Sequence, residues 1–383
     1  MKKRHKLFYR HRLASSIFYL FSFAALICTV SIVYTSITSS LNISGEGIVD
    51  GPVNEYYYKS GYFYEDEACK TKVTSNGSDV RKFSDMVNIA KDGNTIYMMS
   101  EYTVGVGTEE VTVGAKNIQV KRHPSFTSRS MFDVVVSSSA PSSEYRTFTI
   151  KAENSSGSIV FDGQNIEVST SEGGLFDLYG ANATLNIIGS EKSNGEKNVK
   201  LINSKIKNSS YSAGGAIENY YGGTVDLTHC ELSGNSAISS SSSSYEAQGG
   251  AIYSTSNVAT LNLNSCTIRN NIVSGINDRV QGGGVYNGKN MTIKGKMIIE
   301  NNKSSINGVE KTDNLYLYYS TVDTSGLTSG SRIGITTSKT PTSSSNVTIS
   351  PSGKAASTAS YFFSDVSGYI VSLVNNALVL KVG

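Results

Sequence analysis

Two cysteines and one histidine are the residues of this 383-residue chain that most resemble a reactive set. Cys230 and Cys266 stand at equivalent places in two similar segments, 36 residues apart. If those segments stack as neighbouring strands, the two Cα atoms lie about 4.8 Å apart, within the range of a disulfide. Stacked neighbours point their side chains the same way, which favours a buried file of small residues. We therefore keep both interpretations, stacked thiols and a disulfide.

Asp226 and His229 precede Cys230 at a spacing that could serve a metal site or an acid/base pair. The next similar segment has Ser265 where His229 stands, so this set occurs once. A single histidine beside a strand is usually structural. We predict no metal and no cofactor for this chain.

Carboxylates are the remaining candidates for catalysis, because glycoside hydrolysis uses two of them across a groove. In the similar segments they fall at different positions, and the sequence has no Asp-Asp, Asn-Thr-Asp, Gly-His-Gly or Cys-x-x-Cys cluster. We predict no catalytic residues, and keep a β-helical polysaccharide lyase or glycoside hydrolase as the alternative. The acids in question are Glu218, Asp226, Glu231, Glu246, Asp278 and Glu300.

Tyrosine clusters are candidates for binding rather than catalysis. An exposed Tyr offers a large, rigid face that stacks on sugar rings or partner proteins. The alternative is that these residues only cover the sides of the fold. The candidate ligand-contact residues are Tyr220, Tyr221, Tyr316, Tyr318 and Tyr319.

The elements that would position these residues lie in three repeated segments, which begin 35 and 33 residues apart. Each has a Gly pair, short alternating strands and a closing Asn. Such strands cannot enclose a core alone, but stacked coils can. The pattern predicts an all-β, right-handed parallel β-helix, with Gly at tight corners and Asn in a ladder. The repeat positions are Gly214, Gly215, Gly249, Gly250, Gly282, Gly283, Asn235, Asn271 and Asn302.

The N-terminus predicts export. Residues 1–12 hold six basic residues and no acid, and residues 13–45 hold no charge. This pattern predicts a signal peptide or a signal-anchor helix over residues 1–40, so the rest is secreted or displayed with its C-terminal part outside. Without that segment the formal charge is 28 − 31 = −3, which argues against nucleic-acid binding.

The remaining chain divides into a pre-cap linker at 41–77, a capped β-helix at 78–313 with its clearest repeats at 214–305, and terminal strands with a C-terminal cap at 314–383. An N-terminal cap helix is expected to start at Ser78 and to present Phe83, Met86 and Val87 on one face.

The repeats resemble those of the chlamydial polymorphic outer-membrane proteins. The resemblance rests on Gly-Gly-Ala-Ile at 214–217 and 249–252, and on an aliphatic-x-x-Asn motif that ends at Asn235, Asn271 and Asn302. It implies a bacterial cell-surface adhesin that binds host protein or glycan along the solenoid. The membrane barrel that ends those proteins has no counterpart in residues 304–383.

Overall fold

The computed structural model describes residues 54–209, 211–240, 246–255 and 259–383, all within one compact unit, Val53–Gly383. The predicted export segment, residues 1–40, lies outside the described residues. Within the described residues, no helix is long and apolar enough to cross a membrane.

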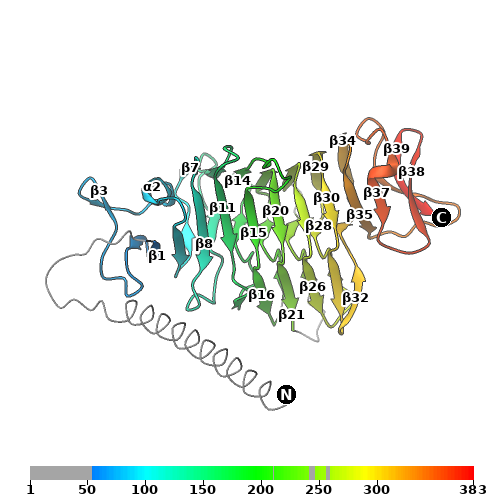
Figure 1. Cartoon of the computed structure of the whole chain (residues 1–383). Helices are drawn as coiled ribbons and strands as arrows, with labels where there is room; N and C mark the ends of the chain where they lie inside the picture. Colours follow the sequence, from blue (N-terminus) through cyan, green and yellow to red (C-terminus); the bar gives the residue numbers. More distant parts are fainter. Residues whose placement is uncertain (1–53, 210, 241–245, 256–258) are drawn as a thin grey trace, which may run out of the picture. The chain divides into compact units, whose positions relative to one another are not determined.

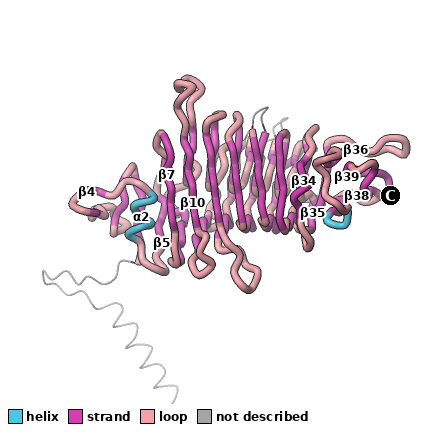
Figure 2. The backbone as a smooth tube through the Cα atoms, turned by 90° about the horizontal axis from the view of Figure 1, so that it is seen from above, coloured by secondary structure: helices cyan, strands magenta, loops and turns pink. Residues whose placement is uncertain are grey.

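Strands stacked in long parallel ladders make up most of this unit (Figure 1), which confirms the prediction of an all-β fold built from stacked coils. Each regular coil runs through three walls, which we call face 1, face 2 and face 3 in chain order. Figure 2 shows the strands lying side by side along the stack.

Face 1 carries the candidate site and pairs in parallel register along the stack. Its strands are β6 (Tyr102–Thr103), β9 (Phe132–Val135), β13 (Phe176–Tyr179), β18 (Ile217–Tyr220), β23 (Ile252–Thr255), β28 (Val285–Asn287) and β33 (Leu315–Leu317).

Face 2 is a seven-stranded parallel sheet. Its strands are β7 (Gly107–Thr112), β10 (Arg146–Lys151), β14 (Ala183–Ile188), β19 (Thr224–Thr228), β24 (Thr260–Asn264), β29 (Asn290–Gly295) and β34 (Val322–Leu327).

Face 3 is the longest ladder. Its strands are β1 (Glu55–Lys59), β5 (Thr95–Met98), β8 (Asn117–Arg122), β11 (Ser158–Asp162), β15 (Val199–Ile202), β20 (Cys230–Ser233), β25 (Thr267–Arg269), β30 (Ile298–Glu300), β35 (Arg332–Thr337) and β37 (Phe362–Ser364).

A two-layered excursion, which we call the flap, leaves face 3 and returns to face 1. Its outgoing strands are β12 (Glu167–Val168), β16 (Lys205–Asn208), β21 (Ser236–Ser239), β26 (Ile272–Gly275) and β31 (Lys303–Ile306), with β32 (Val309–Thr312) antiparallel at the end; its returning strands are β17 (Ser212–Ala213), β22 (Ala247–Gln248) and β27 (Val280–Gln281).

Apolar residues form files through the interior because every second residue of a strand points inward. On face 2, Val225, Leu261 and Met291 stand in register and are buried in the main core. The flap has a small core of its own, in which Ile206 and Val273 of its outgoing strands pack with Val280 of the return. The low apolar content of the sequence is therefore enough, since each coil needs only a few inward side chains.

The helix expected near Ser78 is α2, and it covers Phe83–Ile89. Ser78 instead lies in β4 (Ser78–Asp79), which pairs with β3 (Thr74–Ser75), so the predicted N-cap at Ser78 is wrong. Lys82 occupies the N-cap and offers no side-chain hydrogen bond. The predicted apolar face is present, because Phe83, Met86 and Val87 are buried in the main core.

The two ends of the stack carry further strands. β1 is paired in parallel with β5, and β2 (Tyr62–Tyr64) pairs with β1, although both fall within the segment predicted as a linker. At the other end, an antiparallel sheet of β36 (Val347–Ser350), β39 (Ala377–Val382) and β38 (Tyr369–Val374) follows, with a short 3-10 helix at Ala359–Tyr361.

Candidate functional site

The Gly pairs lie where the flap returns to face 1. Gly214, Gly249 and Gly282 have φ values of 65°, 67° and 70°, in the left-handed region that Gly adopts without strain. The second glycine of a pair has no room for a side chain, since a Cβ on Gly215 would lie 2.0 Å from the carbonyl oxygen of Gly250. The sharp turn sets the flap beside face 1, and the two form a concave corner.

One file of side chains points outward from face 1 into this corner, and we call it the outward file. Its members stand in register on successive strands. They are Asp133, Asp177, Glu218, Tyr253, Tyr286 and Tyr316. The first three form an acid half and the last three a tyrosine half, so one structural position changes its chemistry midway along the stack.

The tyrosine half is a continuous stack of rings. The centroids of Tyr253 and Tyr286 are 5.3 Å apart at 25°, and those of Tyr286 and Tyr316 are 5.5 Å apart at 15°. These separations follow the strand spacing of about 4.8 Å, which suits offset stacking. Ala213 of the flap packs against the rings and all three are buried. Tyr316, predicted as a ligand contact, therefore supports the stack from inside.

Two exposed tyrosine pairs flank this stack at the corner between face 1 and face 2. Tyr220 and Tyr221 meet edge to face with centroids 4.2 Å apart, and Tyr318 and Tyr319 do so at 4.8 Å. Tyr220 stacks on Tyr253, and Tyr318 stacks on Tyr286. Tyr221 is 52% exposed and Tyr319 is 68% exposed.

The two pairs line one groove of about 620 Å³. Between them its lining includes Thr255, Gly288 and Lys289. A Cβ on Gly288 would lie 2.6 Å from the Thr255 hydroxyl oxygen, so the glycine keeps this part of the lining low. The sequence-predicted Tyr220, Tyr221, Tyr318 and Tyr319 are therefore brought together across four successive coils.

The backbone holds the outer residue of each pair in an unusual conformation. Tyr221 has φ 57° and Tyr319 has φ 49°. A bulky residue in the left-handed region costs about 1–2 kcal/mol relative to glycine. Other turns of this chain place Asn at such positions, for example Asn203, Asn270 and Asn301. Two tyrosines held in this strained conformation at one groove are therefore candidates for ligand binding.

A second groove of about 430 Å³ adjoins the first and shares Tyr319 with it. Hydroxyl and amide side chains such as Thr337 and Asn346 line much of it. The Nζ atom of Lys339 lies 5.6 Å from the centroid of the Tyr319 ring. Polar groups that adjoin an aromatic platform give this region both stacking and hydrogen-bonding capacity.

In the acid half of the file, Asp177 and Glu218 are buried and Asp133 is half-buried; of the three, only Glu218 is among the acids considered from the sequence. Asp177 is 8% exposed and Glu218 is 5% exposed. Burial, together with repulsion from neighbouring carboxylates, raises the pKa of both well above the usual range. The pKa of Asp133 rises to about 7 for the same reasons, with Glu101 and Glu172 as the repelling groups. One of its oxygens, Oδ1, has no hydrogen-bond partner.

The predicted Asn positions form a ladder at the turn from face 3 to the flap. The Oδ1 atom of Asn271 accepts hydrogen bonds from the backbone N–H (2.9 Å) and the side-chain amide (3.0 Å) of Asn235. The Oδ1 atom of Asn302 accepts the same two hydrogen bonds from the backbone N–H and the side-chain amide of Asn271. The Oδ1 atom of Asn314 accepts the corresponding two hydrogen bonds from Asn302. The carboxylate of Asp365 accepts them from Asn314 and ends the ladder. Both end members lie beyond the three repeated segments, so the repeat pattern does not indicate them.

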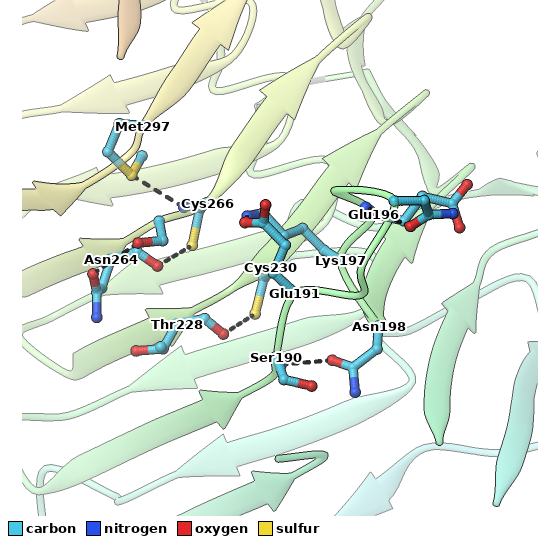
Figure 3. A network of polar contacts seen from close by, with 12 residues as sticks. Ser190, Glu191, Glu196, Lys197, Asn198, Thr228, Cys230, Asn264, Cys266 and Met297 are labelled. Atoms are coloured by element: carbon cyan, nitrogen blue, oxygen red, sulfur yellow. Dashed lines mark hydrogen bonds and ion pairs between the residues drawn. The ribbon is translucent and has the colours of Figure 1, made fainter. Parts of the chain in front are cut away.

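Cys230 begins β20 and Cys266 directly precedes β25, on successive coils of face 3, and both thiols are free and buried (Figure 3). The Cys230 thiol donates to the carbonyl of Thr228 at 3.3 Å, and the Cys266 thiol donates to that of Asn264 at 3.4 Å. The Cys266 backbone N–H donates to the sulfur of Met297 at 3.2 Å. Burial raises the pKa of the Cys230 thiol well above its usual range, which opposes thiolate chemistry.

The candidate metal set is not assembled. Asp226 accepts a hydrogen bond of 2.6 Å from the side chain of Asn262 on the next coil, and burial lowers the pKa of His229. Among the described residues, no group of three or more His, Cys, Asp or Glu side chains is arranged to hold a metal ion.

Comparison of the chain with protein-family models, curated proteins and solved structures found no match. The resemblance to the chlamydial repeats therefore stays a prediction.

Proposed function

We propose that this chain is an exported, cell-surface protein that binds glycan in the tyrosine groove of a right-handed parallel β-helix capped by α2. The observation that carries the proposal is the groove itself. Two exposed tyrosine pairs are fixed on a buried stack of three further tyrosines. Flat aromatic faces bind the apolar faces of sugar rings.

The spacing of the pairs favours an extended ligand. They stand three coil steps apart, or about 14 Å at the strand spacing. The two platforms thus fit separate rings of one oligosaccharide better than one small molecule. Because Tyr220 and Tyr318 rest on buried rings, little side-chain freedom is lost on binding.

A glycan array probed with the purified full chain tests this proposal. We expect binding to a defined set of oligosaccharides, with affinity that increases with chain length up to a few rings. Exclusive binding to host proteins stripped of glycans would instead favour a protein partner and overturn the glycan assignment.

Export is tested separately by protease treatment of intact cells that produce the chain. We expect residues 54–383 to be digested from outside, and N-terminal sequencing of the native protein to tell a cleaved signal from an anchor. Full protection in intact cells, with digestion after lysis, would contradict surface display.

A second candidate function is the polysaccharide-active enzyme, and the acid half of the outward file favours it. Asp133, Asp177 and Glu218 lie one coil step apart, and a carboxyl with a pKa of about 7 suits a general acid. We expect a reducing-sugar and lyase panel on the glycans found by the array to decide between the two. Turnover that is lost in Asp133→Asn would establish the enzyme, and a blank panel would leave binding as the function.

A further inference from the structure

Lysines line the tyrosine groove and the groove beside it, and no acidic residue among those described does. Lys289 lines the groove, and Lys339 lines the adjoining one that shares Tyr319. Both lysines are exposed. Among the described residues that line the two grooves, none is Asp or Glu.

The two ammonium groups are available to a ligand. No ion pair within the described part of the chain engages either of them. Some other surface lysines are paired, for example Lys151 with Glu110 at 2.8 Å and Lys303 with Glu310 at 2.6 Å. When a sugar ring stacks on an aromatic side chain, a cation beside that side chain can contact the substituents at the edge of the sugar ring.

The groove also has a direction. Tyr220 belongs to the same strand as the buried carboxyl of Glu218, whereas Tyr319 lies beside Lys339. The acid half of the file thus borders one end and Lys339 borders the other, with Lys289 between the two tyrosine pairs. An anionic ligand group is favoured at the Tyr318–Tyr319 end.

We propose that the groove selects glycans that carry carboxylate or sulfate groups, with Lys289 and Lys339 binding the anionic substituent beside Tyr319. This inference rests on the glycan binding proposed above and names the class of glycan. The tyrosines provide stacking that any sugar could use, and the lysines provide the selection.

Two matched pairs of probes test the selection with the full chain: oligogalacturonate against its methyl ester, and dextran sulfate against dextran. The first pair varies only the carboxylate charge and the second only the sulfate. At low ionic strength we expect the anionic member of at least one pair to bind about tenfold more tightly, because two exposed charge contacts are each worth a few-fold. The preference should vanish near 1 M salt, where the screening length is about 3 Å.

The double variant Lys289→Gln/Lys339→Gln is expected to bind the two members of the preferred pair with affinities that agree within about twofold. The matched control Lys82→Gln/Lys91→Gln removes the same charge at two exposed lysines outside the grooves and should keep the preference.

Each result decides. Equal binding of neutral and anionic probes by the unaltered chain overturns the selection and leaves glycan binding standing. A preference that survives in the Lys289/Lys339 variant overturns the assignment to these lysines. Binding to none of the four probes or to any array glycan overturns the selection and the proposed function together.

Discussion

The acid half and the tyrosine half of the outward file occupy the same position of the same fold and behave in opposite ways. Tyrosines repeated every 5.3–5.5 Å attract one another through offset ring stacking. Carboxylates at the same spacing repel, so burial and repulsion raise the pKa of Asp177 and Glu218.

In a parallel stack, the interaction between neighbouring side chains recurs at every coil, whether that interaction is attractive or repulsive. The strand spacing is fixed by backbone hydrogen bonds, so the side chains cannot move apart to relieve repulsion. Repeated rings therefore form a rigid platform, and repeated carboxyl groups have raised pKa values and keep their protons to higher pH. The boundary between the two lies between Glu218 and Tyr253.

We expect the largest effect on stability from a substitution that moves the boundary between the acid half and the tyrosine half. Tyr253→Glu would place a fourth carboxyl beside Glu218 and remove a ring from the stack. We expect the free energy of unfolding at pH 7 to fall by about 3–5 kcal/mol, through lost burial and an uncompensated charge. Urea unfolding at pH 5 should show a smaller loss, because the carboxyl is then protonated more easily.

Tyr253→Phe is the matched control, since it keeps the ring. We expect it to cost about 1 kcal/mol or less at either pH. Equal losses for the Phe and Glu variants at pH 7 would assign the effect to the lost hydroxyl, and not to the added charge or the lost ring.

Removing a carboxyl from the acid half should give the next largest effect, with the opposite sign. The folded chain holds a proton on Asp133 up to about pH 7, whereas an unfolded Asp releases it near pH 4. The contribution of Asp133 to stability is therefore greatest below about pH 4 and falls as the pH rises to about 7. Asp133→Asn should flatten this fall and raise the free energy of unfolding at pH 8 by about 2–3 kcal/mol.

Thermal unfolding between pH 4 and pH 8 measures this change. The exposed acid Asp278 provides the comparison, since Asp278→Asn should leave the pH profile unaltered. If the dependence of stability on pH were as steep in Asp133→Asn as in the unaltered chain, groups other than Asp133 would have to cause it.

The smallest effect on stability should come from the strained tyrosines. Tyr319→Gly relieves the left-handed backbone and should raise the free energy of unfolding by up to about 1 kcal/mol. Glycan binding should weaken at the same time. A variant that is less stable and still binds would show that the strain has no connection with the ligand.

The sequence was informative where a residue recurred at a fixed spacing. The Gly pairs and three of the ladder asparagines could be located because the backbone requires the same residue in each coil, and Tyr221 and Tyr319 were noticed as parts of clusters. Tyr253 and Tyr286 were overlooked as single residues. Each follows a Gly pair by the same offset, four residues after Gly249 and Gly282, and that signal could have found them.

The same offset marks two of the three acids, since Asp177 lies four residues after Gly173 and Glu218 four after Gly214, whereas Asp133 follows no Gly pair. Asp133 and Asp177 are 44 residues apart, and Asp177 and Glu218 are 41 apart, against 35 and 33 for the next steps. Loops of unequal length hide the register in the early coils. Asp365 was equally hidden, because it reaches the ladder from a strand 51 residues beyond Asn314.

The most direct test of the account is a calorimetric titration of the double variant Tyr221→Ala/Tyr319→Ala with the tightest glycan from the array. Tyr145→Ala is the control, since Tyr145 is 49% exposed and lies outside the groove. We predict that the double variant binds at least about tenfold more weakly, with its thermal stability kept, and that the control binds like the unaltered chain. Unaltered affinity in the double variant would contradict the account.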